Sequence, residues 1–180
     1  MIKNAMYFGK RDLYNLIKRV GGEWNDTKDR PIFCCIESLE HKGLYWAIPV
    51  GNYNHRGASA KRRINNFINL PPENIASCYY HIGQTTIKSI FFISDVIPVI
   101  DKYIERGYIN NYTASIHIVK NKTLISELEN KLKRILAYEN SNPNFFRQHI
   151  TDVKNELLKE LKKTCLCRLN IIIQEIYKNK

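Results

Sequence analysis

The stretch that decides the fold is PIFCCIES-LEHKG-LYWAIPV, residues 31–50. Its two apolar runs, residues 31–38 and 44–50, are rich in β-branched and aromatic side chains, and five residues that include Gly43 join them. Two such runs with a short glycine-containing joint are typical of a β-hairpin. Pro49 has no N–H for a ladder hydrogen bond, so it predicts an edge or a bulge there. We therefore expect a hairpin whose second strand ends near Pro49 and opens into a loop.

Similar patterns on both sides of the hairpin predict the other elements. Strands are expected at residues 5–8, 78–82, 87–93 and 96–100, and helices at residues 10–20, 58–69 and 101–106. Beyond residue 112, Leu, Ile and Val recur every three or four positions, which predicts long helices on either side of a turn at residues 140–144, the second over residues 153–176.

Strands that precede helices in this way are typical of an α+β fold. We expect a compact antiparallel, barrel-like sheet covered by helices. The length of 180 residues fits a single domain over residues 1–180, strand-rich in 1–112 and helical in 113–180.

The charge of the chain is uneven. Lys and Arg number 28 and Asp and Glu 17, a net charge of +11 that makes a polyanion the first partner to consider. The chain is also rich in Ile, Asn and Lys, which weakens an argument from net charge alone. Residues 41–94, however, contain a single acid, Glu73. We call this segment the acid-poor window and expect it to carry the function.

The ends of the chain and its cysteines argue against several protein classes. The first ten residues lack the apolar stretch of a signal peptide, and no run approaches the ~18 apolar residues that span a bilayer. Five cysteines are an odd number, and their spacing does not match a zinc site. We expect a cytoplasmic protein with reduced thiols, without a membrane partner and without a structural metal.

The segment GNYNHRG, residues 51–57, combines the residues best suited to chemistry. An imidazole has a reference pKa near ~6.5 and can exchange a proton at neutral pH, which makes His55 a candidate acid or base, although a solvated loop histidine is the alternative. Arg56 presents a fork that matches a phosphoryl group, and Asn52 can donate its amide to the same oxygen. Tyr53 has no apolar periodicity around it, so we predict that it is exposed and positions a base. These four residues form the predicted catalytic set.

The rest of the acid-poor window supplies a predicted path for RNA, because cations bind phosphates and flat side chains stack on bases. The proposed RNA-binding residues are Lys42, Lys61, Arg62, Arg63, Lys88, Tyr79, Tyr80 and His81. No acid lies four residues after the Lys61–Arg63 triplet, so an ion pair within the helix is absent; a solvated helix face is the alternative. His81 is a second candidate acid or base, although its apolar neighbours favour a buried structural role. We interpret Tyr45 and Trp46 as core residues.

The reaction class follows from the missing carboxylates. Two-metal hydrolysis needs clustered acids, and the window has one, so we expect neither a metal nor another cofactor. RNA cleavage would then use the 2'-hydroxyl of the substrate as the nucleophile. The expected products are a 2',3'-cyclic phosphate and a 5'-hydroxyl.

The hairpin with Lys42 near its turn, the loop GNYNHR after the Pro-containing strand and the basic helix that follows resemble the toxins of type III toxin-antitoxin systems. Among these the chain is most similar to the CptN branch, related to ToxN and AbiQ. The likeness covers the first hundred residues best, and Lys42 matches the family's hairpin lysine. The ToxN branch has a Thr-Ser-x-Lys type of loop where this chain has Gly51 to Arg56, so the role of His55 is our inference.

The resemblance implies an SH3-like barrel similar to MazF and Kid, and a metal-independent endoribonuclease of phage defence. It also implies two RNA partners: cellular RNA substrates, and a repetitive pseudoknot antitoxin that the toxin cuts and then holds in a protein–RNA hetero-oligomer. Two alternatives remain from the residues themselves. One is a non-catalytic RNA- or DNA-binding module, and the other is an interaction subunit that uses the apolar stripe of the last helix.

Overall fold

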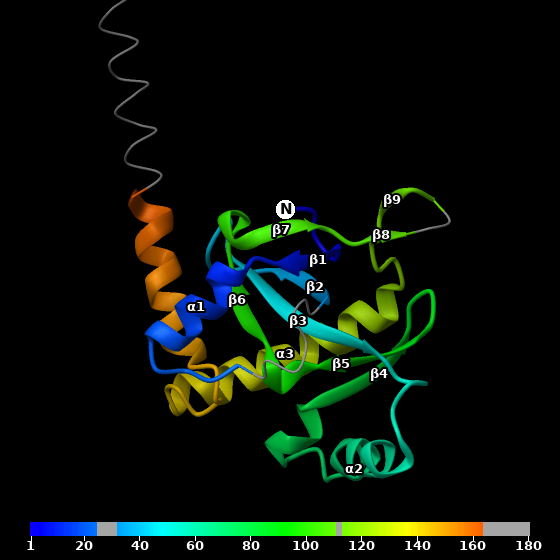
Figure 1. The fold of residues 1–180 in the computed structure, drawn as a ribbon. Helices are drawn as coiled ribbons and strands as arrows, with labels where there is room; N and C mark the ends of the chain where they lie inside the picture. The colour runs from blue at the N-terminus through cyan, green and yellow to red at the C-terminus, as the bar shows by residue number, and fades with distance from the viewer. Residues whose placement is uncertain (25–31, 111–112, 164–180) are drawn as a thin grey trace, which may run out of the picture.

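Figure 1 shows the computed structural model of the chain, which describes residues 1–24, 32–110 and 113–163. Within these ranges one antiparallel sheet contains β1 (Met6–Gly9), β2 (Ile32–Glu37), β3 (Tyr45–Asn52), β4 (Tyr80–Gln84), β5 (Lys88–Phe92), β6 (Ile97–Val99) and β7 (Ile104–Gly107). A second, two-stranded sheet pairs β8 (Ile109–Asn110) with β9 (Ser115–Ile116). The helices are α1 (Arg11–Arg19), α2 (Ala58–Ile68), α3 (Lys122–Ser141) and residues 150–163, with short 3-10 turns η1 (Ile75–Cys78), η2 (Ile93–Asp95) and η3 (Asp101–Tyr103). The predicted α+β class with an antiparallel sheet is confirmed.

The main sheet does not close into a barrel among the described residues, so the expected barrel-like form of the sheet is not confirmed. Its order is β4-β5-β3-β2-β1-β7, with β6 as a second partner of β3, and among the described residues β4 and β7 do not pair with each other. One edge of β3 changes partner along its length: Tyr45 to Ala47 pair with β6, and Val50 to Asn52 pair with β5. Pro49 lies at this change, where a residue without an N–H costs the ladder least.

The predicted hairpin is β2 and β3, in register from Ile32 opposite Val50 to Glu37 opposite Tyr45. Gly43 adopts a φ of 84° in the turn, a backbone conformation that favours glycine. The strand side chains from Phe33 to Ile36 and from Tyr45 to Ile48 are buried, including the predicted core residues Tyr45 and Trp46. Such continuous burial requires cover on both faces of the hairpin. Side chains of α1, α3 and residues 150–163 belong to the same buried cluster, which provides this cover.

The helices differ in how firmly they join the core. In α3, Leu124, Leu128, Leu132 and Ile135 are buried at the predicted spacing, and Asn121 Oδ1 caps its start by accepting from the Leu124 N–H at 3.1 Å. In α2 only Ile64 is buried. Figure 1 shows α2 at the border of the fold, beside β4 and away from α1 and the last helix. It is therefore an outlying element that leaves most of its side chains in solvent.

Several boundaries differ from the expectations. The predicted helix over residues 101–106 is wrong, because Asp101–Tyr103 form only η3 and the chain then pairs with β1 as β7. The strand expected at residues 78–82 begins at Tyr80, after η1. The last helix begins at residue 150 rather than 153, and the part of its predicted range beyond residue 163 lies outside the described residues. No helix in the described part of the chain is long and apolar enough to cross a membrane.

Cys34, Cys35 and Cys78 are buried free thiols, and Cys165 and Cys167 lie outside the described residues. Burial raises the pKa of the Cys34 thiol to about 12, so this side chain is a neutral packing group.

Candidate nucleic-acid interface

The loop between β3 and α2 is tied down by its own hydrogen bonds. Asn52 Oδ1 accepts from the Asn54 N–H at 2.9 Å, the pattern of an Asx turn. The Tyr53 N–H donates to the Lys88 carbonyl on β5 at 2.9 Å, and the Arg56 N–H donates to the Tyr53 carbonyl at 3.1 Å. The Asn52 side-chain oxygen is thus engaged in the turn. These bonds fix the positions from which the side chains of residues 53–56 project.

Tyr53 is buried, which corrects the prediction that its ring is exposed for stacking on a base. Only 9% of its surface is accessible, and it forms a small apolar cluster with Ile64 of α2 and Ile90 of β5. The physical reason is that α2 contributes one fully buried side chain of its own, so the loop supplies an aromatic anchor that joins α2 to the sheet. A Tyr between two Asn gives no periodic signal of such a role.

Two amines approach this buried ring. Lys61 Nζ lies 5.4 Å and Lys88 Nζ 5.0 Å from the centroid of Tyr53. Such distances are typical of cation–π contacts, which hold an ammonium group without neutralising it. Lys61 Nζ also lies 3.4 Å from the Asn54 carbonyl oxygen. Tyr53 therefore positions cations at the interface instead of contacting a base itself.

Arg56 is the third cation of this cluster. Its guanidinium carbon lies 5.1 Å from the centroid of Phe92, and its Nε is buried without a hydrogen-bond partner among the described residues. A Cβ at position 51 would lie 2.7 Å from Arg56 Nη2, so Gly51 leaves the space that the guanidinium occupies. Phe92 and Gly51 were not predicted as site residues. The alternation of the strand at residues 88–92 is the signal that would have placed Phe92 on the face of Ile90.

His55 is exposed at the tip of the loop, next to Arg56. Gly57 is the N-cap residue of α2 and provides no side-chain cap, and the first turn of α2 contains no acid. The N–H groups of a helix start and its dipole favour an anion at this end. Arg62 and Arg63 follow on α2 and are exposed. No carboxylate in the described part of the chain forms an ion pair with a lysine or arginine of the window from Arg56 to Lys88.

The remaining predicted residues do not all join this cluster. Lys42 lies in the β2–β3 turn, at the opposite end of β3 from Asn52. At ~3.3 Å per residue the strand separates these two positions by roughly 25 Å. A path that includes both Lys42 and His55 would therefore have to follow the whole length of β3.

His81 lies on the other face of the sheet from the cation cluster. Its Nε2 lies 3.2 Å from Glu127 Oε2 of α3, and burial, together with the nearby Lys131 ammonium, lowers its pKa. Its neighbour Tyr80 points the opposite way, with its ring 5.9 Å from that of Phe92. Successive side chains of a strand alternate between the two faces, so His81 does not lie on the face of Phe92 and Arg56.

Tyr79 and Tyr80 are half-buried, and both rings pack against aromatic side chains. The ring of Phe67 on α2 lies 5.7 Å from Tyr79 and 5.6 Å from Tyr80. Burial raises the pKa of both phenols, and the charge of Arg63 opposes the shift for Tyr80. These two tyrosines pack α2 against the sheet, and Tyr80 lies close enough to Arg63 to border the same basic surface.

No group of three or more His, Cys, Asp or Glu side chains able to hold a metal occurs among the described residues. No protein-family model matches the chain, and a search of curated proteins finds no match.

Proposed function

We propose that this chain is a metal-independent endoribonuclease toxin of a type III toxin-antitoxin system, inhibited by a repetitive RNA antitoxin. The observation that supports it most is the convergence of Arg56, Lys61 and Lys88 on the loop that presents His55. All are drawn from a window with one acid, so the cluster suits a polyanion. The SH3-like barrel that the family resemblance implies remains part of this proposal, although the described sheet is not closed.

In the proposed complex the scissile phosphate lies between Arg56 and the start of α2. The guanidinium, held on Phe92, donates two parallel hydrogen bonds to non-bridging oxygens, and the free N–H groups of α2 add donors. Lys61 and Lys88, whose amines both lie over the Tyr53 ring, supply further positive charge. Charge grows on the phosphoryl oxygens in the transition state, so fixed donors at this place lower the barrier.

The proposed reaction is attack of the ribose 2'-oxygen on phosphorus with loss of the 5'-oxygen of the next nucleotide. The 2'-hydroxyl proton goes to a base, the P–O5' bond breaks, and the leaving oxygen takes a proton from an acid. His55 is the titratable group best placed to serve as one of these two. The products are a 2',3'-cyclic phosphate and a 5'-hydroxyl.

The exposed Arg62 and Arg63 extend the positive surface along α2 beyond the loop. In this proposal they bind phosphates on either side of the cut and carry no sequence information. Lys42, at the far end of β3, contacts RNA only where the RNA is long enough to reach it, as a folded antitoxin would be. The same cations serve the substrate and the inhibitor, which explains how a bound antitoxin blocks cleavage.

The test is cleavage of RNA by the purified protein in EDTA, with His55→Ala and Arg56→Ala as variants. His41→Ala, at a half-buried histidine in the β2–β3 turn, is the control for the first. Arg106→Ala is the control for the second, because its guanidinium also lies over an aromatic ring, Phe8 at 4.0 Å, but far along the sheet on β7. Full activity in both loop variants, or activity only with added metal, would overturn the proposed site.

A second function, RNA binding without cleavage, is favoured by the separation of His81 from His55. The cluster then has one histidine from the predicted set, which is enough for binding but leaves the second proton transfer to lysine or water. Toxicity distinguishes the two. A ribonuclease prevents growth when it is expressed without its antitoxin, and the His55→Ala variant restores growth, whereas a binding protein gives no difference between the two.

A further inference from the structure

A cavity of about 370 Å³ lies between the sheet and the end of α3. Its apolar wall is formed by Ile36 of β2, Trp46 of β3, Leu132 and Leu136 of α3 and Ile150 at the start of the last helix. The volume is within the range of small-molecule sites, and an apolar wall with few polar groups is their usual character. The cavity lies at the end of β3 that is remote from His55, so it is a separate site.

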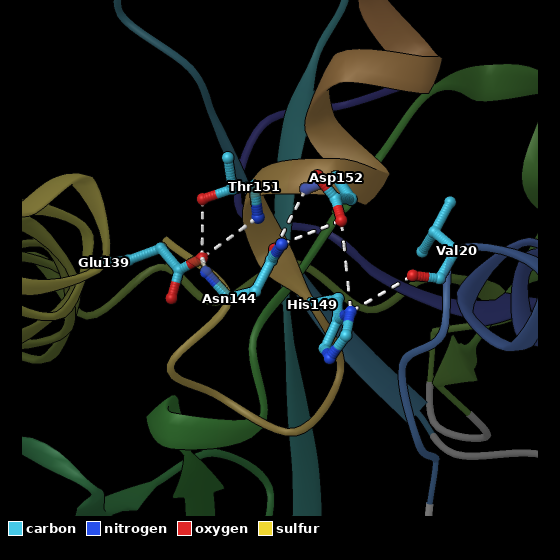
Figure 2. A network of polar contacts seen from close by, with 6 residues as sticks. All are labelled: Val20, Glu139, Asn144, His149, Thr151 and Asp152. Atoms are coloured by element: carbon cyan, nitrogen blue, oxygen red, sulfur yellow. Dashed lines mark hydrogen bonds and ion pairs between the residues drawn. The ribbon is translucent and has the colours of Figure 1, made fainter. Parts of the chain in front are cut away.

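Glu139 lines this cavity and is 2% exposed. Its Oε1 accepts from the Asn144 N–H at 2.8 Å, the Thr151 N–H at 3.1 Å and the Thr151 hydroxyl at 2.6 Å. Figure 2 shows these contacts converging on one carboxylate oxygen, which caps the helix that begins at residue 150. The two ends of the loop between the helices are thereby joined, and the position of Glu139 is fixed.

The other carboxylate oxygen of Glu139, Oε2, accepts no hydrogen bond from the described residues. This oxygen is also buried. In Figure 2 it points away from Thr151 and Asn144. Buried carboxylate oxygens without a partner are costly, because the lost hydration is not replaced. A group at the cavity that donates a hydrogen bond to Oε2 would remove this cost.

The charges around the cavity favour a donor that is also a cation. The lining contains four carboxylates, those of Glu37, Glu40, Glu129 and Glu139, against the amines of three lysines. One of these lysines, Lys3, already lies 3.8 Å from Glu129. In a chain with a net charge of +11 this is a local reversal of sign. Because Lys3 and Glu129 pair with each other, three carboxylates remain against two amines, so a cationic ligand suits this lining better than an anionic one.

We propose that the cavity between Trp46, Leu132 and Leu136 binds a small molecule with an apolar body and a primary amine, whose N–H group donates to Glu139 Oε2. The apolar body replaces water against the wall, and the amine pairs with the free carboxylate oxygen. The proposal does not depend on ribonuclease activity, because none of the residues of the cation cluster line the cavity.

The experiment uses two probes of similar shape and opposite polarity, 2-phenylethylammonium and 3-phenylpropionate, titrated into the full chain. The readout is the indole N–H resonance of Trp46 in a proton–nitrogen NMR spectrum. Trp24 is the internal reference, because it packs against Tyr14 and Phe33 and does not line the cavity. The expected result is a saturable shift of the Trp46 resonance with the amine alone, while that of Trp24 stays in place. No saturable shift with the amine overturns the proposal.

Glu139→Gln tests the role of Oε2 itself. The amide keeps one acceptor oxygen for Asn144 and Thr151 and presents an N–H donor where the free acceptor was. The amine should then bind about tenfold more weakly or worse, and the carboxylate probe should gain relative to it. Unchanged amine affinity in the folded variant would contradict the proposal.

Leu136→Trp provides a second variant that leaves the capping bonds intact. Leu136 is half-buried on α3 and lines the cavity, so a larger side chain there fills the space of the ligand. We expect it to abolish the amine-dependent shift. Leu70→Trp, at a half-buried leucine that does not line the cavity, should keep the shift. Equal binding by both variants would show that the amine binds elsewhere.

Discussion

Charged groups are bound differently in two regions: the corner, formed by residues 52–63 with Lys88 of β5, and the junction between α3 and the last helix. At the corner Arg56, Lys61 and Lys88 rest on aromatic rings, and no described carboxylate forms an ion pair with them. At the junction a single oxygen of Glu139 accepts three hydrogen bonds. Cation–π contacts position a charge and leave its donors free, whereas a capping carboxylate spends its oxygen on the fold. The cations of the corner therefore keep donors that an anion could use, as the proposed function requires, whereas Glu139 Oε1 is used by the fold itself.

The largest effect on RNA cleavage is expected from removing the Arg56 guanidinium. Arg56→Ala should lower the rate of RNA cleavage by about 10²–10³-fold, because it removes a donor to the developing charge. Its melting temperature should change little, since the guanidinium has no ion-pair partner among the described residues. Single-turnover cleavage and thermal unfolding measure the two quantities. A large loss of stability with the rate per folded molecule intact would make Arg56 a structural residue.

Removing the Glu139 carboxylate from the junction should lower stability and leave the rate of cleavage unchanged. Glu139→Ala leaves two N–H groups and a hydroxyl without their acceptor, at a cost to the free energy of unfolding of about 2–4 kcal/mol. Cleavage by the fraction that remains folded should be unchanged. Urea unfolding gives the stability, and Glu129→Ala, at a half-buried glutamate 3.8 Å from Lys3, serves as the control with an expected change below about 0.5 kcal/mol. Equal losses in the two variants would show that Glu139 does not cap the helix.

Tyr53 has two roles: its ring packs α2 against the sheet, and it holds the amines of Lys61 and Lys88. Tyr53→Ala should destabilise the fold by about 2–4 kcal/mol, since a buried aromatic anchor between α2 and β5 is lost. Tyr53→Phe should retain both stability and RNA affinity, because the ring provides the packing and the cation–π contacts. Urea unfolding and RNA binding measure the pair. A stable Tyr53→Ala variant with weak RNA binding would restore the idea of an exposed stacking residue.

Gly51→Ala is a smaller perturbation of the corner. The added methyl would lie 2.7 Å from Arg56 Nη2 and 3.3 Å from the Phe92 ring, so the guanidinium has to move. We expect about tenfold slower cleavage, as for a modest misplacement of a positioned group, with a small change in melting temperature. Gly57→Ala is the matched control, because a Cβ there meets nothing within 4 Å among the described residues. Equal activity of the two variants would mean that Arg56 does not need its place on Phe92.

The smallest effect concerns pH and His81. Burial lowers the pKa of His81, so the unfolded chain takes up a proton at a higher pH than the folded chain does. Its contribution to stability is therefore complete above about pH 6.5 and is lost as the pH falls through the lowered pKa of the folded state. His81→Gln should flatten the pH dependence of the free energy of unfolding between pH 7 and 5, which urea unfolding at several pH values measures. A steeper dependence in His81→Gln would show that the ion pair with Glu127 outweighs burial.

The sequence predicted the hairpin, α1, α2 and α3 well because each has a strong local signal: apolar runs with a glycine joint, or a buried stripe at helical spacing. The prediction is wrong where pairing with a strand distant in the sequence determines the secondary structure. Residues 101–106 have helical spacing but extend into β7 because β1 offers an unpaired edge.

The candidate site was predicted in part for the same reason. The cations of the window and the loop are visible in the sequence, but the face on which each side chain lies depends on strand register. The sequence therefore predicts an exposed Tyr53 and a His81 on the RNA path. In the structure Tyr53 is buried against Ile64 of α2, and His81 lies beside Glu127 of α3. Glu139 carried no sequence signal, since its partner Thr151 lies 12 residues away across the loop between two helices.

The central claim is tested most directly by the ends of the RNA fragments that the purified chain produces in EDTA. The account predicts 2',3'-cyclic phosphate and 5'-hydroxyl ends, formed by the wild-type chain and by Arg106→Ala and nearly absent with Arg56→Ala. Fragments with 5'-phosphate ends, or no fragments from the wild-type chain with its predicted antitoxin removed, would contradict it.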